Sequence, residues 1–466
     1  MDRAWKRRLR LLAADSPELR ELRETELIVG DTGAAAVARL LPASTHLREL
    51  WLPHCDIGAT GARALGRALP LARALRTLGL RGNFLGNTGV AQLASGGGTL
   101  ALTQLDLQSN GITADGGLAL ARLLHVAPAL QTLCLSGNAL DDQGLIALAA
   151  GAGQHATLQR LEMRSVGAGH DGTLALVQAL AGRFVEPQVT LGLHDSAAMP
   201  PAVHGVQSGV LTGLFLHGMD LADDSLLALA AVLHDDPPLA TLRLFASRLG
   251  TNGIAALCCA LQGNTRLRSL DLSVAVHSRQ PSVYAHIVAD LAAMIAHNTG
   301  VATLNLRGID LGGRDNAALL GTALAANASL THLELQNNFQ QDSESAQAVL
   351  CGLADNVSLV SITMDTFGIR DEHAAILADL VRRHPRLKGL HLPNNRLAAG
   401  GAVLLAAVAS NHRITHVDLA RNGITENDDN AFCRILHHRC ARDTVTKYIR
   451  RKERKKEGRK EGRKEE

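Results

Sequence analysis

The residues that come nearest to a chemical site are Cys433, His437 and Cys440. Their spacings of four and three residues place them on one face of a helix. Thiolate and imidazole groups are usual ligands of Zn²⁺, and His438 could supply a fourth. However, no second Cys or His cluster lies nearby in the sequence, and a terminal helix with small buried cysteines would contain the same residues. We therefore predict no metal site.

Motifs of the common enzyme classes are absent from the sequence. No Gly-Lys pair occurs, which excludes a phosphate-binding P-loop. His-Glu-x-x-His and Gly-x-Ser-x-Gly are also absent. No cysteine is followed two residues later by Asp, so the Cys-x-Asp signature of one class of bacterial ubiquitin ligase is missing. We predict that the protein is not an enzyme and has no catalytic residue and no cofactor.

Cysteine use and hydropathy bear on the compartment. The 7 cysteines are odd in number and widely scattered, unlike a secreted disulfide framework. The first residues are too charged for a signal peptide, and no apolar stretch reaches membrane-spanning length. We expect a cytoplasmic protein with no membrane partner.

The basic charge is concentrated at the C-terminus. Residues Lys447 to Glu466 contain 11 Lys and Arg against 5 Asp and Glu, whereas the rest of the chain has 36 against 39. We assign residues 441–466 to a charged, basic, low-complexity tail that we expect to be disordered. A nuclear-import address or a nucleic-acid patch is the alternative, but interspersed glutamates and the lack of aromatics favour a solvated tail.

Most of the chain repeats one pattern, Leu-x-x-Leu-x-Leu-x-x-Asn-x-Leu, followed by an Ala- and Leu-rich stretch. Leu75, Leu78, Leu80, Asn83 and Leu85 show it clearly. Fourteen units of mostly 27 to 29 residues begin at Leu47, Leu75, Leu102, Leu130, Leu158, Gln188, Leu211, Leu239, Leu267, Val301, Leu330, Leu359, Leu387 and Ile414. The alternating leucines predict a short strand with one buried face, and the stretch that follows predicts a helix.

Stacked units of this kind predict an α/β fold, a right-handed β-α solenoid of horseshoe type. A parallel sheet would form its concave face and helices its convex face. We assign residues 1–46 to an N-terminal helical cap with a degenerate repeat and residues 47–440 to the solenoid. In the cap, Ser16 and Pro17 predict the start of a helix, and a second helix is expected over Asp31–Val37. At the other end, Thr425 is expected to cap a terminal helix.

The repeat length and the helical segment resemble the ribonuclease-inhibitor-like leucine-rich repeat proteins. That subfamily also includes the Ran GTPase-activating proteins and the repeat arms of NLR immune receptors. The resemblance covers about residues 19–440. It implies the horseshoe fold but leaves the function open, because the same fold is used by inhibitors, activators and sensors.

The array is irregular between residues 188 and 300. Several units in this stretch, and the unit just before it, have another residue in place of Asn at the ninth position. These residues are Val166, Ser196, Met219 and Ser247. One unit shortens to 23 residues near Pro200 and Pro201, which we expect to break the helix, and another lengthens to 34. We expect this stretch to be the least stable part of the array. Whether it is a binding site or sequence drift stays open.

The fifth and seventh residues of each unit should point out of the concave face. Neither column is uniformly charged, which favours a protein partner over nucleic acid. Three of the eleven aromatic residues fall in these columns, and such anchors surrounded by charged groups are typical of binding hot spots. The predicted partner-binding residues are Trp51, Arg81, Glu162, Arg164, Phe215, His217, Arg243, Phe245 and Asp271.

The sequence therefore predicts a monomeric, non-enzymatic scaffold that binds a folded protein on its concave face. One alternative is a Ran-type GTPase activator, although that family ends in an acidic tail and this chain ends in a basic one. A further alternative is a bacterial effector or an immune-regulatory repeat protein. The effector reading rests on the scarcity of lysine, since only Lys6 and Lys388 precede Lys447.

Overall fold

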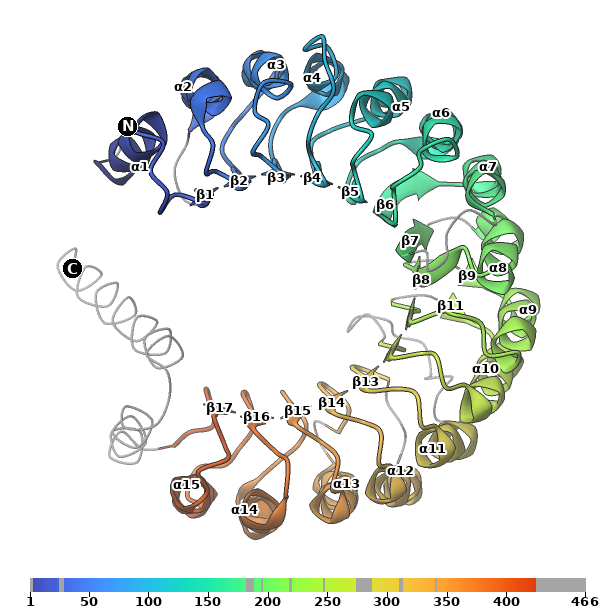
Figure 1. Cartoon of the computed structure of the whole chain (residues 1–466). Coiled ribbons are helices and arrows are strands. Elements are labelled where there is room, and N and C mark those ends of the chain that lie inside the picture. The colour runs from blue at the N-terminus through green and yellow to red at the C-terminus, as the bar shows by residue number, and fades with distance from the viewer. Residues whose placement is uncertain are drawn as a thin grey trace, which may run out of the picture. The chain divides into compact units, whose positions relative to one another are not determined.

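A computed structural model describes residues 3–24, 29–181, 188–193, 196–217, 220–245, 248–273, 287–309, 313–339 and 342–424. The chain divides into two compact units, Met1–Arg248 and Leu249–Glu466. Both units repeat one motif, a short strand followed by a helix (Figure 1). The predicted tail at 441–466, the helix expected after Thr425 and the Cys433 cluster lie outside the described residues.

The described part of the first unit contains nine parallel strands that pair in sequence order. They are β1 (Glu21–Arg23), β2 (Glu49–Trp51), β3 (Thr77–Gly79), β4 (Gln104–Asp106), β5 (Thr132–Cys134), β6 (Arg160–Ala168), β7 (Gln188–Leu193), β8 (Leu211–Leu216) and β10 (Thr241–Arg243). Two further strands, of two residues each, are β9 (Asp220–Leu221) and β11 (Arg248–Leu249).

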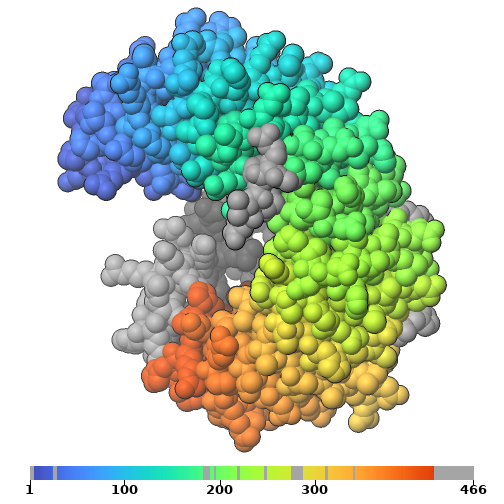
Figure 2. All heavy atoms as spheres, turned by 45° about the vertical axis from the view of Figure 1, so that its right-hand side comes forward, coloured from blue at the N-terminus to red at the C-terminus, as the bar shows by residue number. Residues whose placement is uncertain are grey.

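Helices carry the chain from each strand to the next. They are α1 (Arg3–Ala13), α2 (Gly30–Leu40), α3 (Ala59–Ala68), α4 (Gly86–Leu93), α5 (Gly116–Val126), α6 (Asp141–Ala152), α7 (His170–Leu180), α8 (Met199–Gln207) and α9 (Asp223–His234). Within this unit the helices lie on the outer side of a curve and the strands on its inner side (Figure 1). Successive repeats are in contact along the unit, from the blue to the green atoms (Figure 2).

The leucine pattern produces both layers. In the repeat that begins at Leu75, the side chains of Leu75, Leu78, Leu80 and Leu85 are all at most 2% exposed. They fill the space between strand and helix, while the residues between them face the other side of the strand. Twelve of the fourteen predicted repeat starts lie two residues before a strand, and the other two, Gln188 and Leu211, are the first residues of β7 and β8.

The degenerate repeat predicted within residues 1–46 has a strand of its own, β1. Leu22 in β1 is fully buried and pairs with Leu50 in β2. Leu19 and Leu22 have the spacing of the first two leucines of a repeat, so the signal was present in the sequence. The helix expected over Asp31–Val37 is confirmed as part of α2.

The helix expected to begin at Ser16 is not formed. The structure instead has α1 before it, with Trp5 and Leu12 buried at 1% and 2% exposure. Apolar residues recur at helical spacing in α1. After Ser16, by contrast, only Leu19 is apolar before β1, and the chain crosses to the sheet through turns.

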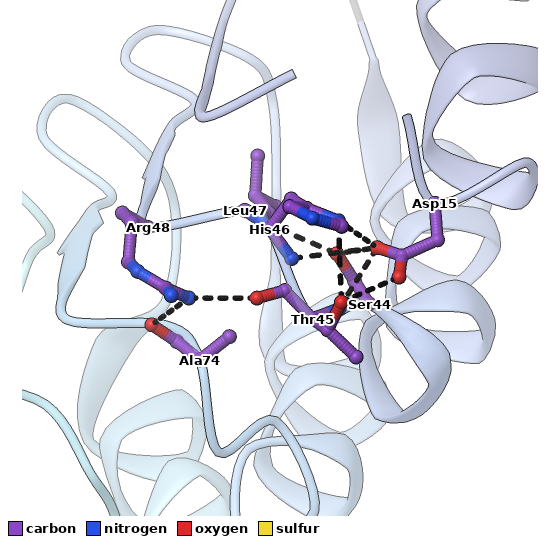
Figure 3. A network of polar contacts seen from close by, with 7 residues as sticks. All are labelled: Asp15, Ser44, Thr45, His46, Leu47, Arg48 and Ala74. Carbon is purple, nitrogen blue, oxygen red and sulfur yellow. Dashed lines mark hydrogen bonds and ion pairs between the residues drawn. The ribbon is translucent and has the colours of Figure 1, made fainter. Parts of the chain in front are cut away.

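Asp15 fastens α1 to the turn before β2 (Figure 3). The Thr45 amide donates to Oδ1 over 2.8 Å, and the Thr45 hydroxyl donates to Oδ2 over 2.6 Å. The Nδ1 atom of His46 lies 3.3 Å from Oδ1. Because these hydrogen bonds favour the ionised carboxylate, they lower the pKa of Asp15 to about 2, with the Thr45 hydroxyl contributing most.

Buried asparagines at the ninth repeat position join successive repeats. The Nδ2 group of Asn83 donates to the carbonyls of Leu52 and Leu80, both over 2.8 Å. Its Oδ1 atom accepts from the amides of Cys55 and Ile57, both over 3.0 Å. A bond to the preceding repeat recurs at Asn110, Asn138, Asn338, Asn395 and Asn422. These asparagines form a ladder along the repeats, and the ladder satisfies backbone groups that would otherwise be buried unpaired.

Three consecutive repeats without this asparagine have longer strands, whereas β10, β12 (Ser269–Asp271), β13 (Thr303–Asn305) and β15 (Ser361–Thr363), whose repeats also lack it, have three residues each. β6 has nine residues and β7 and β8 have six each, against three in each of β2 to β5. The pairing also shifts between β6 and β7, at a bulge between Met163 and Ala168. Before this bulge Glu162 pairs with Thr190, so the alignment of Glu162 with Gly192 that follows from the predicted repeat starts is wrong. Gly192 does pair with Phe215, as the columns predicted.

Pro200 and Pro201 begin a helix instead of breaking one. They stand in the first turn of α8, where an amide hydrogen has no partner within the helix. The expectation that this pair would prevent a regular helix is therefore wrong.

The described part of the second unit has six strands and six helices. The strands are β12 (Ser269–Asp271), β13 (Thr303–Asn305), β14 (His332–Glu334), β15 (Ser361–Thr363), β16 (Gly389–His391) and β17 (His416–Asp418), which pair in parallel from β12 to β17. The helices are α10 (Thr251–Gly263), α11 (Val288–His297), α12 (Arg314–Ala326), α13 (Ser343–Asp355), α14 (Ala374–Arg383) and α15 (Gly400–Ser410). None of the helices in the described chain combines the length and apolar character that a bilayer crossing requires.

This unit has a second row of asparagines, at its helix ends. Asn327 follows α12 and donates from Nδ2 to the carbonyls of Ile295 and Asn298 in the preceding repeat. Its Oδ1 atom accepts from the amides of Ser329 and Leu330. Asn298, Asn356 and Asn411 make equivalent bonds to the repeat before them. This second row of asparagines was not predicted, although Asn recurs there at the repeat spacing.

Candidate protein-binding surface

Strand alternation separates core from surface in β8. Leu214 and Leu216 are fully buried, whereas Phe215 between them is half-buried on the opposite face of the strand. We call this opposite face of the first unit the strand face. The predicted outward direction of the fifth and seventh repeat positions holds here, because consecutive strand residues point to opposite sides.

Phe215 lies between two arginines on neighbouring strands. The Cζ atom of Arg164 is 5.0 Å from the ring centroid, and that of Arg243 is 5.2 Å from it. Arg243 pairs with Phe215 between β8 and β10. Each cation over the ring face contributes about 0.5–1 kcal/mol at an exposed site, so the two guanidinium groups hold the ring in place.

A second aromatic pair lies two residues farther along the same strands. The rings of His217 and Phe245 stack with centroids 4.9 Å apart and planes inclined by 19°. His217 is exposed and Phe245 is half-buried. Arg164, Phe215, His217, Arg243 and Phe245 together form what we call the arginine–aromatic cluster.

Glu162 connects the cluster to β6. Its carboxylate, only 8% exposed, lies 2.6 Å from Arg160 Nη2 and 3.5 Å from Arg164 Nη2. The Nε atom of Arg164 is buried and has no hydrogen-bond partner. One carboxylate therefore balances two arginines at this place, and the charge of Arg164 is only partly compensated.

Trp51 forms a separate cation–aromatic contact on β2. Arg23 Cζ is 4.9 Å from its ring centroid, and its Nε1 donates to Glu49 Oε2 over 2.9 Å. The ring lies over Gly79 on the next strand, where a Cβ atom would come within 2.0 Å of it. Glycine at that position thus makes room for the indole.

Three more predicted concave-face positions lie between these two sites: Arg81 just after β3, Asp106 on β4 and Cys134 on β5. Burial is the main cause that raises the pKa of Asp106, while the nearby charge of exposed Arg81 lowers it. Burial likewise raises the pKa of the Cys134 thiol to about 12, and the carboxylates of Glu162 and Asp106 add to the shift. A thiol with such a pKa stays protonated at neutral pH and is a poor nucleophile.

Asp271 belongs to the second unit, on β12, where its Oδ1 atom accepts from the amide and the hydroxyl of Ser273. The structure thus brings together six of the nine predicted residues, the cluster and Glu162. Trp51 and Arg81 lie on other strands of the first unit. Arg23 and Arg160 were not among the predicted binding residues, although Arg23 is the fifth residue of the repeat that begins at Leu19.

Metal-ligand chemistry is not assembled in the part of the chain that the structure covers. No group of three or more His, Cys, Asp or Glu residues is placed there to hold an ion. What the strand face offers is aromatic surface flanked by arginines, and such surface supports binding of a macromolecule.

The repeat geometry agrees with a family match. A model of the family "Leucine Rich repeat" matches residues 43–66, 102–121 and 128–149. The chain contains leucine-rich repeats, and the matched segments all lie in its first unit. This family provides scaffolds for protein interaction in general.

Relatives match the repeats at low identity. The chain is 26% identical over 339 residues to capping protein, Arp2/3 and myosin-I linker protein 2 of Mus musculus, which covers 69% of this chain and 24% of that protein. It is 28% identical over 214 residues to NACHT, LRR and PYD domains-containing protein 12 of Homo sapiens, covering 45% and 19%. The chain therefore spans about a quarter or less of the length of these relatives.

A solved structure shares the fold. A chain in the crystal structure of the Rad7 and Elc1 complex of yeast superimposes with a TM-score of 0.53 at 17% identity. The match covers 85% of this chain and 90% of that one. At this identity the likeness concerns the fold alone.

Proposed function

We propose that the protein is a non-enzymatic scaffold of the ribonuclease-inhibitor-like type, which binds a folded protein partner through the strand face of its first unit. The observation that carries the proposal is the arginine–aromatic cluster. Phe215 is held between Arg164 and Arg243, and the His217–Phe245 stack continues the same surface.

Physical arguments support this assignment. Aromatic residues are only 2% of the chain, yet two of them, Phe215 and Phe245, lie partly accessible on this face, Phe215 between two arginines and Phe245 against His217. Arg and aromatic anchors dominate interface energies, because they bury large areas with little loss of side-chain freedom. Names of the relatives mention capping protein, Arp2/3 and myosin-I. Since the match covers less than a quarter of one such relative, we propose protein binding without assigning those partners.

Comparative capture from cell lysate tests the proposal. The intact chain, the double variant Phe215→Ala/Phe245→Ala and the control variant Phe84→Ala are immobilised, and the captured proteins are identified by mass spectrometry. Phe84 is a suitable control because its side chain is 71% exposed and lies outside the strand face, in the turn before α4.

We expect a set of proteins that the unchanged chain and Phe84→Ala capture equally and that the double variant loses. The loss should exceed about 2 kcal/mol for a purified partner, without much change in thermal stability. Equal capture by all three proteins would contradict the proposal and move the interface toward Trp51, Arg48, Arg76 and Arg81.

The Ran-type GTPase activator stays a prediction without a described residue in its favour. Hydrolysis of GTP by a small GTPase, measured with and without the protein, tests it directly. The effector and immune-regulatory alternatives concern the biological setting of the same binding surface.

A further inference from the structure

The strand face of the first unit contains the same motif twice, an aromatic ring beneath an arginine, with different charge surroundings. At Trp51 the protein supplies the balancing acids itself. Arg23 Nε donates to Glu21 Oε1 over 2.8 Å, and Trp51 Nε1 donates to Glu49. The Nε atom of Arg23 and the Nε1 atom of Trp51 thus each have a carboxylate acceptor within the protein, and the charge of Arg23 is balanced there.

At Phe215 the balancing acid is missing for one arginine. Arg243 is exposed, and its only described interaction is the one with the Phe215 ring, with no hydrogen bond or ion pair to another described side chain. A guanidinium group carries five N–H donors in a planar fork that matches a carboxylate. These donors face solvent beside a partly accessible aromatic ring.

Arg164 adds to this imbalance from the other side of the ring. It shares Glu162 with Arg160, at 3.5 Å and 2.6 Å respectively, and its Nε atom is buried without a partner. Arg160, Arg164 and Arg243 together face one carboxylate. Among the described residues of the first unit, the three arginines around Phe215 thus exceed the carboxylates that contact them by two positive charges.

We propose that the arginine–aromatic cluster binds an acidic segment of the partner, in which an Asp or Glu carboxylate contacts Arg243 and Arg164 and an adjacent apolar side chain packs on Phe215. This inference rests on the proposed function and specifies the partner's chemistry. The charge complementarity carries it: the site at Trp51 contains its own acids, and the site at Phe215 lacks one.

Peptide selection tests the chemistry without knowledge of the partner. A displayed library of random peptides is selected on the intact chain, on Arg243→Glu and on the matched control Arg122→Glu. Arg122 is an exposed arginine on α5, on the helix side, so its reversal changes the net charge equally. Binding of each enriched peptide, and of its version with Gln and Asn replacing Glu and Asp, is then measured by fluorescence anisotropy.

We expect enriched peptides with acidic residues next to an apolar residue. Their affinity should fall about tenfold or more in Arg243→Glu and in the amide versions, stay unchanged in Arg122→Glu, and weaken with salt. A peptide with Lys in place of the acid should regain affinity for Arg243→Glu.

Enriched peptides without acidic residues, or acidic peptides that bind Arg243→Glu equally well, would overturn the inference. If such peptides still lose binding in Phe215→Ala/Phe245→Ala, the proposed binding surface stands and only the acidic chemistry fails. If they bind that variant unchanged, both fail. Selective capture of a single-stranded oligonucleotide in preference to any acidic peptide would also overturn the inference, because the arginines would then recognise phosphate.

Discussion

Two stretches of the first unit satisfy the same backbone groups by different means. In β2 to β5 the strands have three residues each, and buried asparagines such as Asn83 and Asn138 bridge the turns that follow. In β6 to β8 the asparagine is absent and the strands extend to six or nine residues. The difference shows that the ladder is one solution to backbone pairing and that longer strands are another.

The difference also places the candidate site. Extended strands keep the alternation of side chains going for more residues, so they present more positions on the strand face. Phe215 lies near the end of β8, and Arg164 lies within the extended part of β6. In the asparagine-bearing repeats the position of Phe215 also lies in a strand, as at Gly79 and Asp106, whereas the position of Arg164 lies in the turn that follows. The substitutions below test the comparison, beginning with the largest expected effect.

The core that both stretches share should tolerate no charge. Leu133 is fully buried in β5, so Leu133→Asp should lower the free energy of unfolding by more than about 4 kcal/mol. Gln131 is exposed two residues away, and Gln131→Asp should change it by less than about 0.5 kcal/mol. Chemical denaturation measures both, and similar losses would contradict the repeat register.

Placing the ninth residue of one stretch into the other, Val for Asn138 and Asn for Val166, should destabilise both stretches. Asn138→Val leaves buried backbone groups of two repeats unpaired, so we expect a loss of about 2–4 kcal/mol. Val166 is fully buried within the bulge of β6 between Met163 and Ala168, so Val166→Asn places a polar group in the core and should cost about 1–3 kcal/mol. A stabilising Val166→Asn would show that this repeat merely lacks its asparagine.

Hydrogen exchange should show whether the long strands β7 and β8 are as stable as the strands of the asparagine-bearing repeats. The sequence predicted that residues 188–300 are the least stable stretch. The extended pairing of β7 with β8 leads us to expect that their amides exchange within about tenfold of those in β3 and β4, a difference of about 1.4 kcal/mol. Much faster exchange in β7 and β8 would mean that the longer strands do not replace the ladder.

The smallest effect should come from Asp106. Burial raises its pKa, which means that the folded state disfavours the charged form, so stability is lost as pH rises through the raised pKa. Asp106→Asn should therefore be slightly more stable than the unchanged chain at neutral pH, and the advantage should vanish below the unfolded value of about 3.9. Thermal unfolding across this pH range measures the effect, and a pH-independent difference would contradict it.

Particular residues show how far the sequence could predict the site. Phe215 and Arg243 fall in the fifth column because Leu211 and Leu239 start regular repeats, so their adjacency on paired strands followed from counting. Arg164 and Glu162 were also predicted, but the partner of Glu162 across β6 and β7 was not. The bulge after Met163 shifts the pairing, and a bulge depends on how two strands fit together.

The repeated spacing of leucines determined the fold, because a period of about 28 residues with alternating apolar positions has one efficient way to bury them, a strand and a helix stacked on their neighbours. It also determined which residues leave the core. Only the tertiary structure decided which of those residues meet. Contacts such as Phe215 with Arg164 join residues of nonconsecutive repeats, and which arginines flank the Phe215 ring depends on how the strands pair. The spacing of residues along the chain shows which side chains leave the core, whereas the contacts between them depend on how the repeats pack.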